Sequence, residues 1–250
     1  MARSRIVNTS LPSQTGRHSG LAYGLWLPTV PPQGGVVIIH GADSCKENHH
    51  DFARVAIAAG FAAATFDQRG HGESDGPMDS RMLDDVVDVA ALLRSAAGDP
   101  GLPIALRGSS MGGYLAIVAA ERARARAVVA ICPAPPEGLV RSLRAGRFGF
   151  DADVDAFEAF LTSHDLFAAV KSLKVPLLLL HAEGDERVPV EHSRELAAAT
   201  SFPGSRLLAL RGGHHRSIQH DGELQAASIS FIRRALPRTV DHWPIAGSGR

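Results

Sequence analysis

The chain has 250 residues, of which 45% are hydrophobic and 21% charged, and its 26 basic residues balance its 26 acidic ones. A chain of this length can bury a sizeable core and, in α/β proteins, often forms one domain, so residues 1–250 are predicted to form a single domain. Because basic residues are not in excess, binding to nucleic acid is not expected.

The two cysteines, Cys45 and Cys132, give neither a disulfide framework nor a zinc-binding spacing, and they suit a reducing compartment. The segment Met1–Arg5 contains basic residues, but no apolar run follows it, so a secretory signal is not expected. No stretch approaches the length needed to cross a bilayer. We therefore expect a cytoplasmic protein with no membrane span.

The first predicted strand covers residues 18–27, where large apolar residues from Leu21 to Leu27 occupy alternate positions. A turn rich in proline and glycine follows, and the β-branched run Val36–His40 predicts a strand covered on both faces of a parallel sheet. Helices and strands then alternate along the chain: a helix at 49–59, a strand at 61–66, a helix at 79–97, a strand at 102–107, a helix at 114–120 and a strand at 127–131.

Residues 133–165 interrupt this alternation with prolines, arginines and phenylalanines. The alternation resumes with a strand at 175–180, a helix at 190–199, a strand at 206–210 and a helix at 222–236, and residues from Pro237 on are predicted to be irregular. Strands that alternate with helices predict an α/β fold, a parallel sheet with helices on both faces. Ligands bind such sheets at the carboxyl ends of the strands, so functional residues are expected there.

The segment Gly108-Ser-Ser-Met-Gly112 joins a predicted strand to a predicted helix and has the pattern G-x-S-x-G around Ser110. A serine on so tight a turn adopts a strained backbone conformation, which costs about 1–3 kcal/mol. The flanking glycines avoid contact between a Cβ and the neighbouring strand or helix. The turn places the Ser110 hydroxyl at a helix N-terminus, which favours developing negative charge. The segment therefore predicts a nucleophile.

Nucleotide and metal sites are not predicted. Gly108–Gly113 has the spacing of half a phosphate-binding loop, but Tyr114 occupies the position of the essential lysine. The glycines of Asp67–Gly76 follow a strand, as in dinucleotide-binding proteins, but Pro77 prevents that loop from opening directly into a helix. The histidine pairs 49/50 and 214/215 are sequence neighbours, which point about 100° apart on a helix.

Four local matches in combination resemble the α/β-hydrolase family: His40-Gly41, Asp67–Ser74, Gly108–Gly112, and Asp185 with His215. The resemblance extends from about His18 to Leu236 and is to serine esterases and lipases with a small cap. It implies a mostly parallel central sheet with helices on both faces, and a short helical cap inserted at about 134–165. No cofactor is implied.

The resemblance also implies a role for each site residue. Ser110 would attack the substrate, His215 would take its proton, and Asp185 would orient His215. The oxyanion would be bound by the backbone N–H groups of Met111, directly after the nucleophile, and of Ala42, in the loop after the strand that ends at His40. Because that loop lacks the His-Gly-Gly-Gly of one lipase branch, esters of bulky tertiary alcohols are not expected as substrates.

Neighbouring residues of the same types compete for two of these roles. Asp185 occupies the aspartate position of a G-x-x-D-x-x-V-P-like segment, as in the family, whereas Glu183 and Glu186 are expected to be solvated charges. His215 ends a G-x-x-H run, which selects it as the base, but His214 stays open as the alternative. Two further features, His40 and the Asp67–Gly76 segment, are expected to brace loops at the end of the sheet.

The cap segment carries the residues that bear on the substrate. Phenylalanines either line an apolar wall for an acyl or aryl group or only pack the cap onto the body. They stand at positions 148, 150, 157, 160 and 167. Arg141, Arg144 and Arg147 would either recognise an anionic substrate or form a solvated helix face.

The predicted function is hydrolysis of a small-molecule acyl or aryl ester through an acyl-enzyme formed on Ser110, with a thioester or an amide as other possible substrates. Two alternatives stay open. One is a lyase or acyltransferase that uses the same residues but excludes water. The other is a non-catalytic protein that binds a small ligand on the same scaffold.

Overall fold

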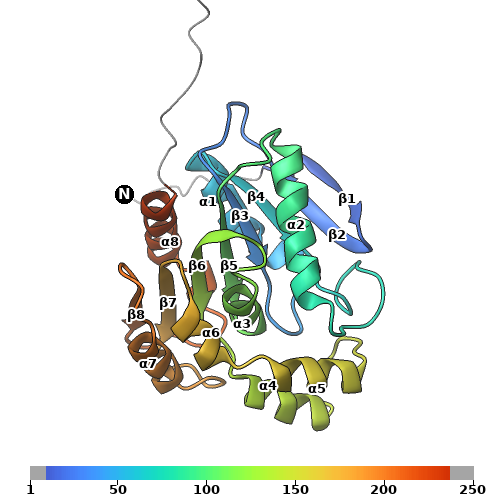
Figure 1. Cartoon of the computed structure of the whole chain (residues 1–250), viewed down its shortest axis with the longest axis vertical. Helices are drawn as coiled ribbons and strands as arrows, with labels where there is room; N and C mark the ends of the chain where they lie inside the picture. Colours follow the sequence, from blue (N-terminus) through green and yellow to red (C-terminus); the bar gives the residue numbers. More distant parts are fainter. Residues whose placement is uncertain (1–9, 237–250) are drawn as a thin grey trace, which may run out of the picture.

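A computed structural model describes residues 10–236 (Figure 1), so the predictions for Met1–Arg5 and for residues from Pro237 on lie outside the described residues. The strands in this part of the chain are β1 (Gln14–His18), β2 (Leu21–Trp26), β3 (Gly35–Ile39), β4 (Ala62–Phe66), β5 (Ile104–Ser109), β6 (Ala125–Ile131), β7 (Leu177–Ala182) and β8 (Arg206–Leu210). They form one sheet in the order β1-β2-β4-β3-β5-β6-β7-β8. β2 is antiparallel to both β1 and β4, and the other neighbouring pairs are parallel. The predicted α/β fold with a mostly parallel sheet is confirmed.

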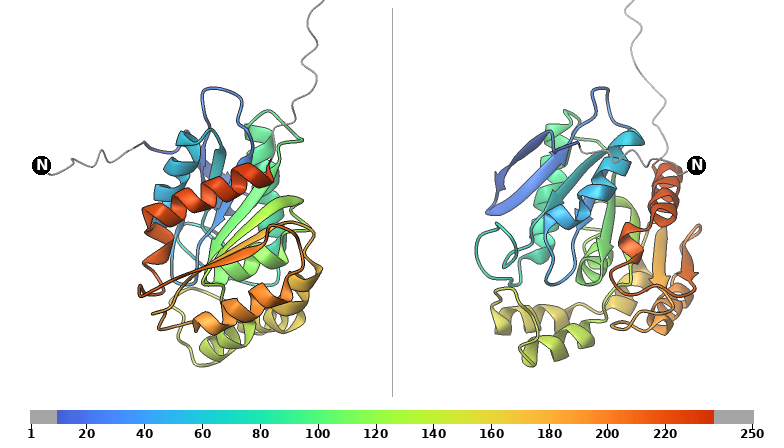
Figure 2. Two further views of the ribbon diagram at one scale, coloured as in Figure 1. Left: turned by 90° about the vertical axis from the view of Figure 1, so that its left-hand side faces the viewer. Right: turned by 180° about the vertical axis from the view of Figure 1, so that it is seen from behind.

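Helices lie on both faces of this sheet. The helices of the described residues are α1 (His50–Ala58), α2 (Met82–Ala96), α3 (Met111–Val118), α4 (Pro136–Arg144), α5 (Val154–Ser163), α6 (Leu166–Ser172), α7 (Val190–Ala199) and α8 (Gly222–Ala235), with short 3-10 helices η1 (Lys46–His49) and η2 (Ile218–His220). Helices α2 and α3 cover the face that Figure 1 presents to the reader, and α1 and α8 cover the opposite face, seen from behind in Figure 2.

Among residues 10–236, no helix has both the length and the apolar character to cross a membrane.

The central strands are apolar on both sides because both faces of the sheet are covered. Successive strand residues point to opposite faces, and β3 shows the consequence. Val37 and Ile39 pack into the core cluster that includes α2 and α3, whereas Val36 and Ile38 pack into the cluster that includes α1 and α8. This two-sided burial explains why the run Val36–His40 is continuously apolar up to the histidine rather than alternating.

The N-terminal strand differs from the prediction. Instead of one strand over residues 18–27, the chain forms a hairpin of β1 and β2 that turns at Ser19 and Gly20, both with positive φ (52° and 83°). Two central residues with positive φ suit a tight hairpin turn. Sequence patterning missed β1 because it is an edge strand with almost every side chain exposed, so it carries no apolar alternation.

The segment predicted as the cap contains α4 and α5, which pack against each other and lie beyond one end of the sheet (Figures 1 and 2). Its phenylalanines mostly join the cap to the body. Phe157 is fully buried and Phe160 nearly so, and Phe150 stacks on His71, with ring centroids 4.1 Å apart. Phe167, in contrast, is 39% exposed on α6.

Candidate active site

Ser110 lies on the turn between β5 and α3, as the G-x-S-x-G pattern predicts, and has φ 55° and ψ −119°. A positive φ is strained for a residue with a Cβ. The turn is held because the Ser110 N–H donates to the Ile131 carbonyl (2.8 Å), while its own carbonyl accepts from the N–H groups of Tyr114 and Ala134 (3.1 and 3.0 Å). The backbone is therefore fixed from three sides, and the side chain remains partly exposed.

Two glycines make the turn sterically possible. A Cβ on Gly108 would lie 1.9 Å from the Gly112 carbonyl oxygen, and a Cβ on Gly112 would lie 2.2 Å from the Ile39 carbonyl oxygen and 2.4 Å from that of His40. These neighbours are backbone atoms of the sheet and helix, which cannot move aside as a side chain can. The predicted steric need for glycine at these two positions is confirmed.

Substitution of Gly112 by alanine should lower the free energy of unfolding by about 3 kcal/mol or more, because the new methyl group overlaps β3 backbone. Gly98→Ala is the matched control: Gly98 has φ +69° and no atom within 4 Å of the added Cβ, so only the backbone penalty of about 1–2 kcal/mol applies. Urea denaturation of both variants measures the difference. Equal losses in the two variants would contradict the steric account of the turn.

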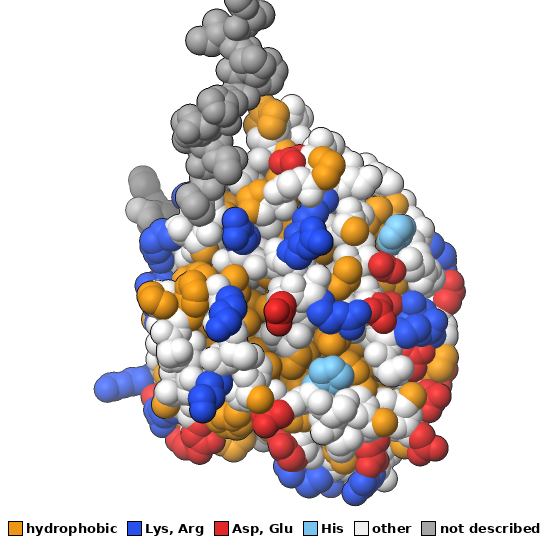
Figure 3. Space-filling view, in the orientation of Figure 1, with side chains coloured by type: hydrophobic (Ala, Val, Ile, Leu, Met, Phe, Trp, Pro, Cys, Tyr) orange, Lys and Arg blue, Asp and Glu red, His pale blue; other side chains and the backbone are white. Residues whose placement is uncertain are grey.

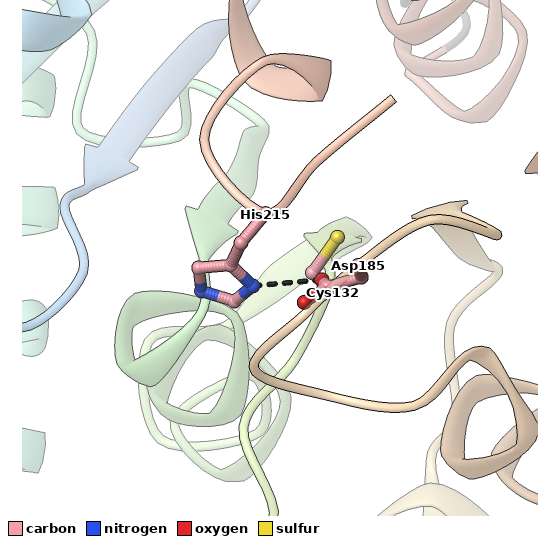
Figure 4. A group of neighbouring side chains, drawn as sticks. All are labelled: Cys132, Asp185 and His215. Carbon is pink, nitrogen blue, oxygen red and sulfur yellow. Dashed lines mark hydrogen bonds and ion pairs between the residues drawn. The ribbon is translucent and has the colours of Figure 1, made fainter. Parts of the chain in front are cut away.

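Asp185 and His215 are joined directly, although they stand on loops after different strands (Figure 4). The His215 Nδ1 lies 2.7 Å from the Asp185 Oδ2. The other carboxylate oxygen accepts from the N–H groups of Arg187 and Val188 (2.8 and 2.9 Å). Burial alone would raise the pKa of the Asp185 carboxyl, but the hydrogen bonds from His181, His215 and the two backbone N–H groups hold it well below its usual range. Asp185 is therefore a permanent carboxylate beneath the imidazole.

The structure separates the two adjacent histidines. The His215 side chain is only 6% exposed and faces Asp185, while the His214 side chain is solvent-exposed and its backbone is hydrogen-bonded to Ser217. The neighbouring glutamates have other partners: Glu186 accepts from the His215 N–H (3.1 Å), and Glu183 pairs with Arg194. Only His215 of the two histidines is thus paired with Asp185.

Ser110 and His215 line one cavity of about 640 Å³, together with Ala42. No hydrogen bond joins Ser110 to His215 within residues 10–236, so the structure brings Asp185 and His215 together but places Ser110 only across the same cavity. Hydrogen bonds between catalytic residues are often long before substrate binds. Ser110 and His215, which is paired with Asp185, therefore share one cavity.

Of the two expected oxyanion donors, Ala42 lines this cavity, and Met111 is buried directly after Ser110. Met111 is the first residue of α3, where backbone N–H groups have no partner inside the helix. Ala42 lines the cavity, and the loop that carries it passes directly over the turn, since a Cβ on Gly41 would lie 3.1 Å from the Ser110 Cβ. One N–H group thus belongs to the first residue of α3 and the other to the loop after β3, and both segments meet at Ser110.

Cys132, at the end of β6, is a site neighbour that sequence reasoning did not identify. Its sulfur and the ligand atoms of Asp185 and His215 lie within 4.8 Å of one another, close enough for a metal ion (Figure 4). Burial raises the pKa of the Cys132 thiol, which therefore keeps its proton, whereas metal ligation needs a thiolate. His215 Nδ1 is also engaged with Asp185. This donor set fits packing beneath the histidine better than metal binding, and its only sequence signal was a cysteine at the carboxyl end of a predicted strand.

His40 and the Asp67–Gly76 segment brace the end of the sheet, as expected. The buried His40 ring accepts from the Gln68 N–H through Nε2 (3.0 Å), and its Nδ1 lies 2.7 Å from the Gly41 carbonyl oxygen. Asp67 accepts from both the backbone N–H and the ammonium group of Lys46 (2.7 and 2.8 Å), and Arg69 pairs with Asp85. These contacts fix the segments that follow β3 and β4.

The free energy of unfolding should fall between pH 7 and pH 5 because His40 is neutral in the folded chain. Burial, and to a lesser extent the charge of His71, lowers the pKa of His40 from 6.5 to about 4. Between these two values the unfolded chain binds more protons than the folded one, so acidification favours unfolding. At pH 5 this single group accounts for about 2 kcal/mol. Urea midpoints across this range measure the slope, and a His40→Asn variant with an equal slope would contradict the assignment.

Comparisons with known proteins show that the chain is similar to hydrolases. The sequence profile of the family described as "Serine aminopeptidase, S33" matches residues 30–142. The chain is 27% identical over 239 residues to a monoacylglycerol lipase of Mycolicibacterium smegmatis, covering 78% of this chain and 85% of the relative. It is 36% identical over 103 residues to human monoglyceride lipase, covering 39% of this chain and 33% of the human protein.

A solved structure extends the likeness to the whole fold. The soluble variant of monoglyceride lipase from Saccharomyces cerevisiae, in complex with a substrate analogue, matches with a TM-score of 0.72 at 16% sequence identity. The match covers 94% of this chain and 98% of the yeast chain. At this identity, the likeness establishes the shared architecture.

Proposed function

We propose that the chain, which has the α/β-hydrolase fold and is similar to lipases and esterases, is a serine hydrolase that cleaves carboxylic esters through an acyl-enzyme on Ser110. The observation that carries the proposal is the placement of Ser110. Its hydroxyl stands on a strained turn at a helix N-terminus, and it lines the same cavity as the imidazole that is paired with a buried carboxylate.

Each residue then has one task in the first half-reaction. His215 donates its Nδ1–H to Asp185, which leaves Nε2 free to accept the proton of the Ser110 hydroxyl as its oxygen attacks the ester carbonyl. The Asp185 carboxylate stabilises the imidazolium that forms. The same proton then passes to the leaving alcohol, and water later repeats the sequence to release the acid.

The oxyanion of the tetrahedral intermediate is bound by backbone donors. The N–H groups of Met111 and Ala42 supply two hydrogen bonds, and the N-terminus of α3 adds the positive end of its dipole. Removal of one such donor in hydrolases typically lowers kcat by about 10²–10³-fold. Because these donors are backbone groups, one at the start of α3 and one in the loop after β3, they need little reorganisation during the reaction.

The names of the relatives support an ester substrate. Two relatives by sequence are a monoacylglycerol lipase and a monoglyceride lipase. A relative by structure, Est1E from Butyrivibrio proteoclasticus, was solved with ferulic acid bound. These names give monoesters of glycerol and, for Est1E, a bound aromatic acid. We therefore propose a monoester of a small alcohol or of an aromatic acid as the substrate class.

Hydrolysis of p-nitrophenyl esters of increasing acyl length tests the proposal. The purified chain should release p-nitrophenolate, and one equivalent of a fluorophosphonate, which reacts with activated serines, should abolish the release. Release that continues after stoichiometric labelling would contradict a serine mechanism. Labelling without turnover of any ester in the series would contradict the esterase assignment.

A further inference from the structure

The cavity that contains Ser110 has an unusual charge balance for a chain with 26 basic and 26 acidic residues. Four arginines line it, and among the described residues Asp43 is the one carboxylate that does so. The arginines are Arg141, Arg147, Arg187 and Arg216. On the face of the molecule in Figure 3, by contrast, basic and acidic side chains are interspersed. The excess of positive charge in the cavity lining thus differs from the mixed charge of that face and from the balanced total of the chain.

These arginines come from two parts of the chain, the cap segment and the loops that carry Asp185 and His215. Arg141 lies on α4, and Arg147 lies in the segment that follows this helix. Arg187 comes two residues after Asp185, and Arg216 comes directly after His215. The cap and the two loops that carry the proposed acid and base thus each contribute positive charge to the same space.

The cavity arginines have weak or no ion-pair partners. Within residues 10–236, Arg141, Arg147 and Arg216 form no salt bridge, and the Arg187 Nε lies 3.9 Å from Glu186, with both side chains more than half exposed. The single lining carboxylate, Asp43, accepts a hydrogen bond from the Gly149 N–H (2.7 Å). The guanidinium groups therefore retain hydrogen-bonding capacity toward a ligand.

Arg144, in the same segment, differs from the cavity arginines because it has an ion-pair partner. It lies on the same helix as Arg141, but it pairs with Glu158 on α5 and does not line the cavity. Of the three arginines that the sequence placed in the cap, the structure thus directs Arg141 and Arg147 to the cavity and Arg144 to a surface ion pair. Substrate recognition is therefore open to Arg141 and Arg147, whereas Arg144 lies on the solvated face.

We propose that the substrate ester carries an anionic group, a carboxylate or a phosphate, which these arginines bind while the ester bond lies at Ser110. This inference rests on the proposed esterase function. Planar guanidinium groups bind both kinds of oxyanion by paired hydrogen bonds. Because the arginines are exposed, the attraction acts mainly at the cavity mouth and is weakened by salt.

Matched pairs of esters test the proposal. Mono-p-nitrophenyl glutarate and p-nitrophenyl valerate have the same acyl length but differ in a terminal carboxylate. A lysophosphatidic acid and the monoacylglycerol with the same acyl chain differ in a phosphate. In at least one pair, kcat/KM should favour the anionic ester by about fivefold at low salt, and high salt should reduce this preference. The pair that shows the preference identifies the anion.

The double variant Arg141→Gln/Arg187→Gln should lower the anionic-to-neutral ratio of kcat/KM to about one. Arg144→Gln, which removes the same charge from the same helix outside the cavity, should leave the ratio at the wild-type value. A wild-type ratio near one in both pairs would overturn the proposal, and so would an equal fall of the ratio in the Arg144→Gln variant.

Binding to the Ser110→Ala variant separates this inference from the proposed function. Calorimetric titration with the same four esters measures affinity without turnover. The anionic ester of a pair should bind more tightly than the neutral one, whether or not the wild-type chain hydrolyses it. If the variant binds the anionic ester selectively but the wild-type chain cleaves none of the four esters, the esterase proposal is wrong and the anion site stands. Equal affinities within both pairs would remove the anion site and leave the esterase proposal standing.

Discussion

Substitution of Ser110 by alanine is expected to lower kcat for p-nitrophenyl butyrate by roughly 10⁴–10⁶-fold, with little change in KM. The hydroxyl is the group that becomes acylated, and the residues around it cannot supply another nucleophile at the same point. Residual activity of the variant should match what the oxyanion donors and substrate binding alone provide. Steady-state kinetics on the purified variant measure the loss.

The adjacent serine is a matched control for this experiment. Ser109 also lines the cavity but is the last residue of β5 and is 7% exposed. Ser109→Ala should keep kcat within about tenfold of the wild type, since its hydroxyl is not at the strained position of the turn. A loss of activity in Ser109→Ala with retention in Ser110→Ala would contradict the assignment of the nucleophile.

Substitution of His215 by alanine is expected to lower kcat by a similar factor, roughly 10⁴–10⁶-fold, because the proton of the serine hydroxyl then has no acceptor. His214→Ala should retain most of the activity, since the His214 side chain is exposed and is not the partner of Asp185. The two variants are matched in residue type and sequence position. The expected difference between their rates is therefore several orders of magnitude.

The outcome also distinguishes a base from a structural histidine. If His215 only held its loop in place, the variant would show a lower unfolding midpoint but a kcat reduced far less than predicted. A reversed pattern, in which His214→Ala is inactive and His215→Ala is active, would show that the loop adopts another register in solution. Circular dichroism of both variants confirms that any loss of rate occurs in a folded chain.

Local sequence patterns predicted the turn at Ser110, where backbone segments pack closely, and the parallel sheet. The need for glycine at Gly108 and Gly112 follows from a short strand-turn-helix connection, and the backbone atoms that crowd both positions confirm it. The alternation of apolar strands with helices likewise predicted the parallel sheet, because a strand buried on both faces leaves a continuous apolar run such as Val36–His40.

Features that depend on tertiary contacts could not be predicted from the sequence. The edge strand β1 is stabilised by pairing with β2 rather than by its own apolar residues. The placement of Cys132 beside Asp185 requires two strands to end at the same edge of the sheet. Spacing on the helix alone did not show that Arg141 faces the cavity while Arg144 pairs with Glu158, since that depends on where α5 packs.

The most direct test of the account is to identify the residue that reacts with a fluorophosphonate. After labelling of the wild-type chain, peptide mass spectrometry should locate one phosphonyl group on Ser110, and the Ser110→Ala variant should remain unlabelled. A label on Ser109, on Cys132 or on any other residue, or labelling that persists in the Ser110→Ala variant, would contradict the proposal that Ser110 is the nucleophile.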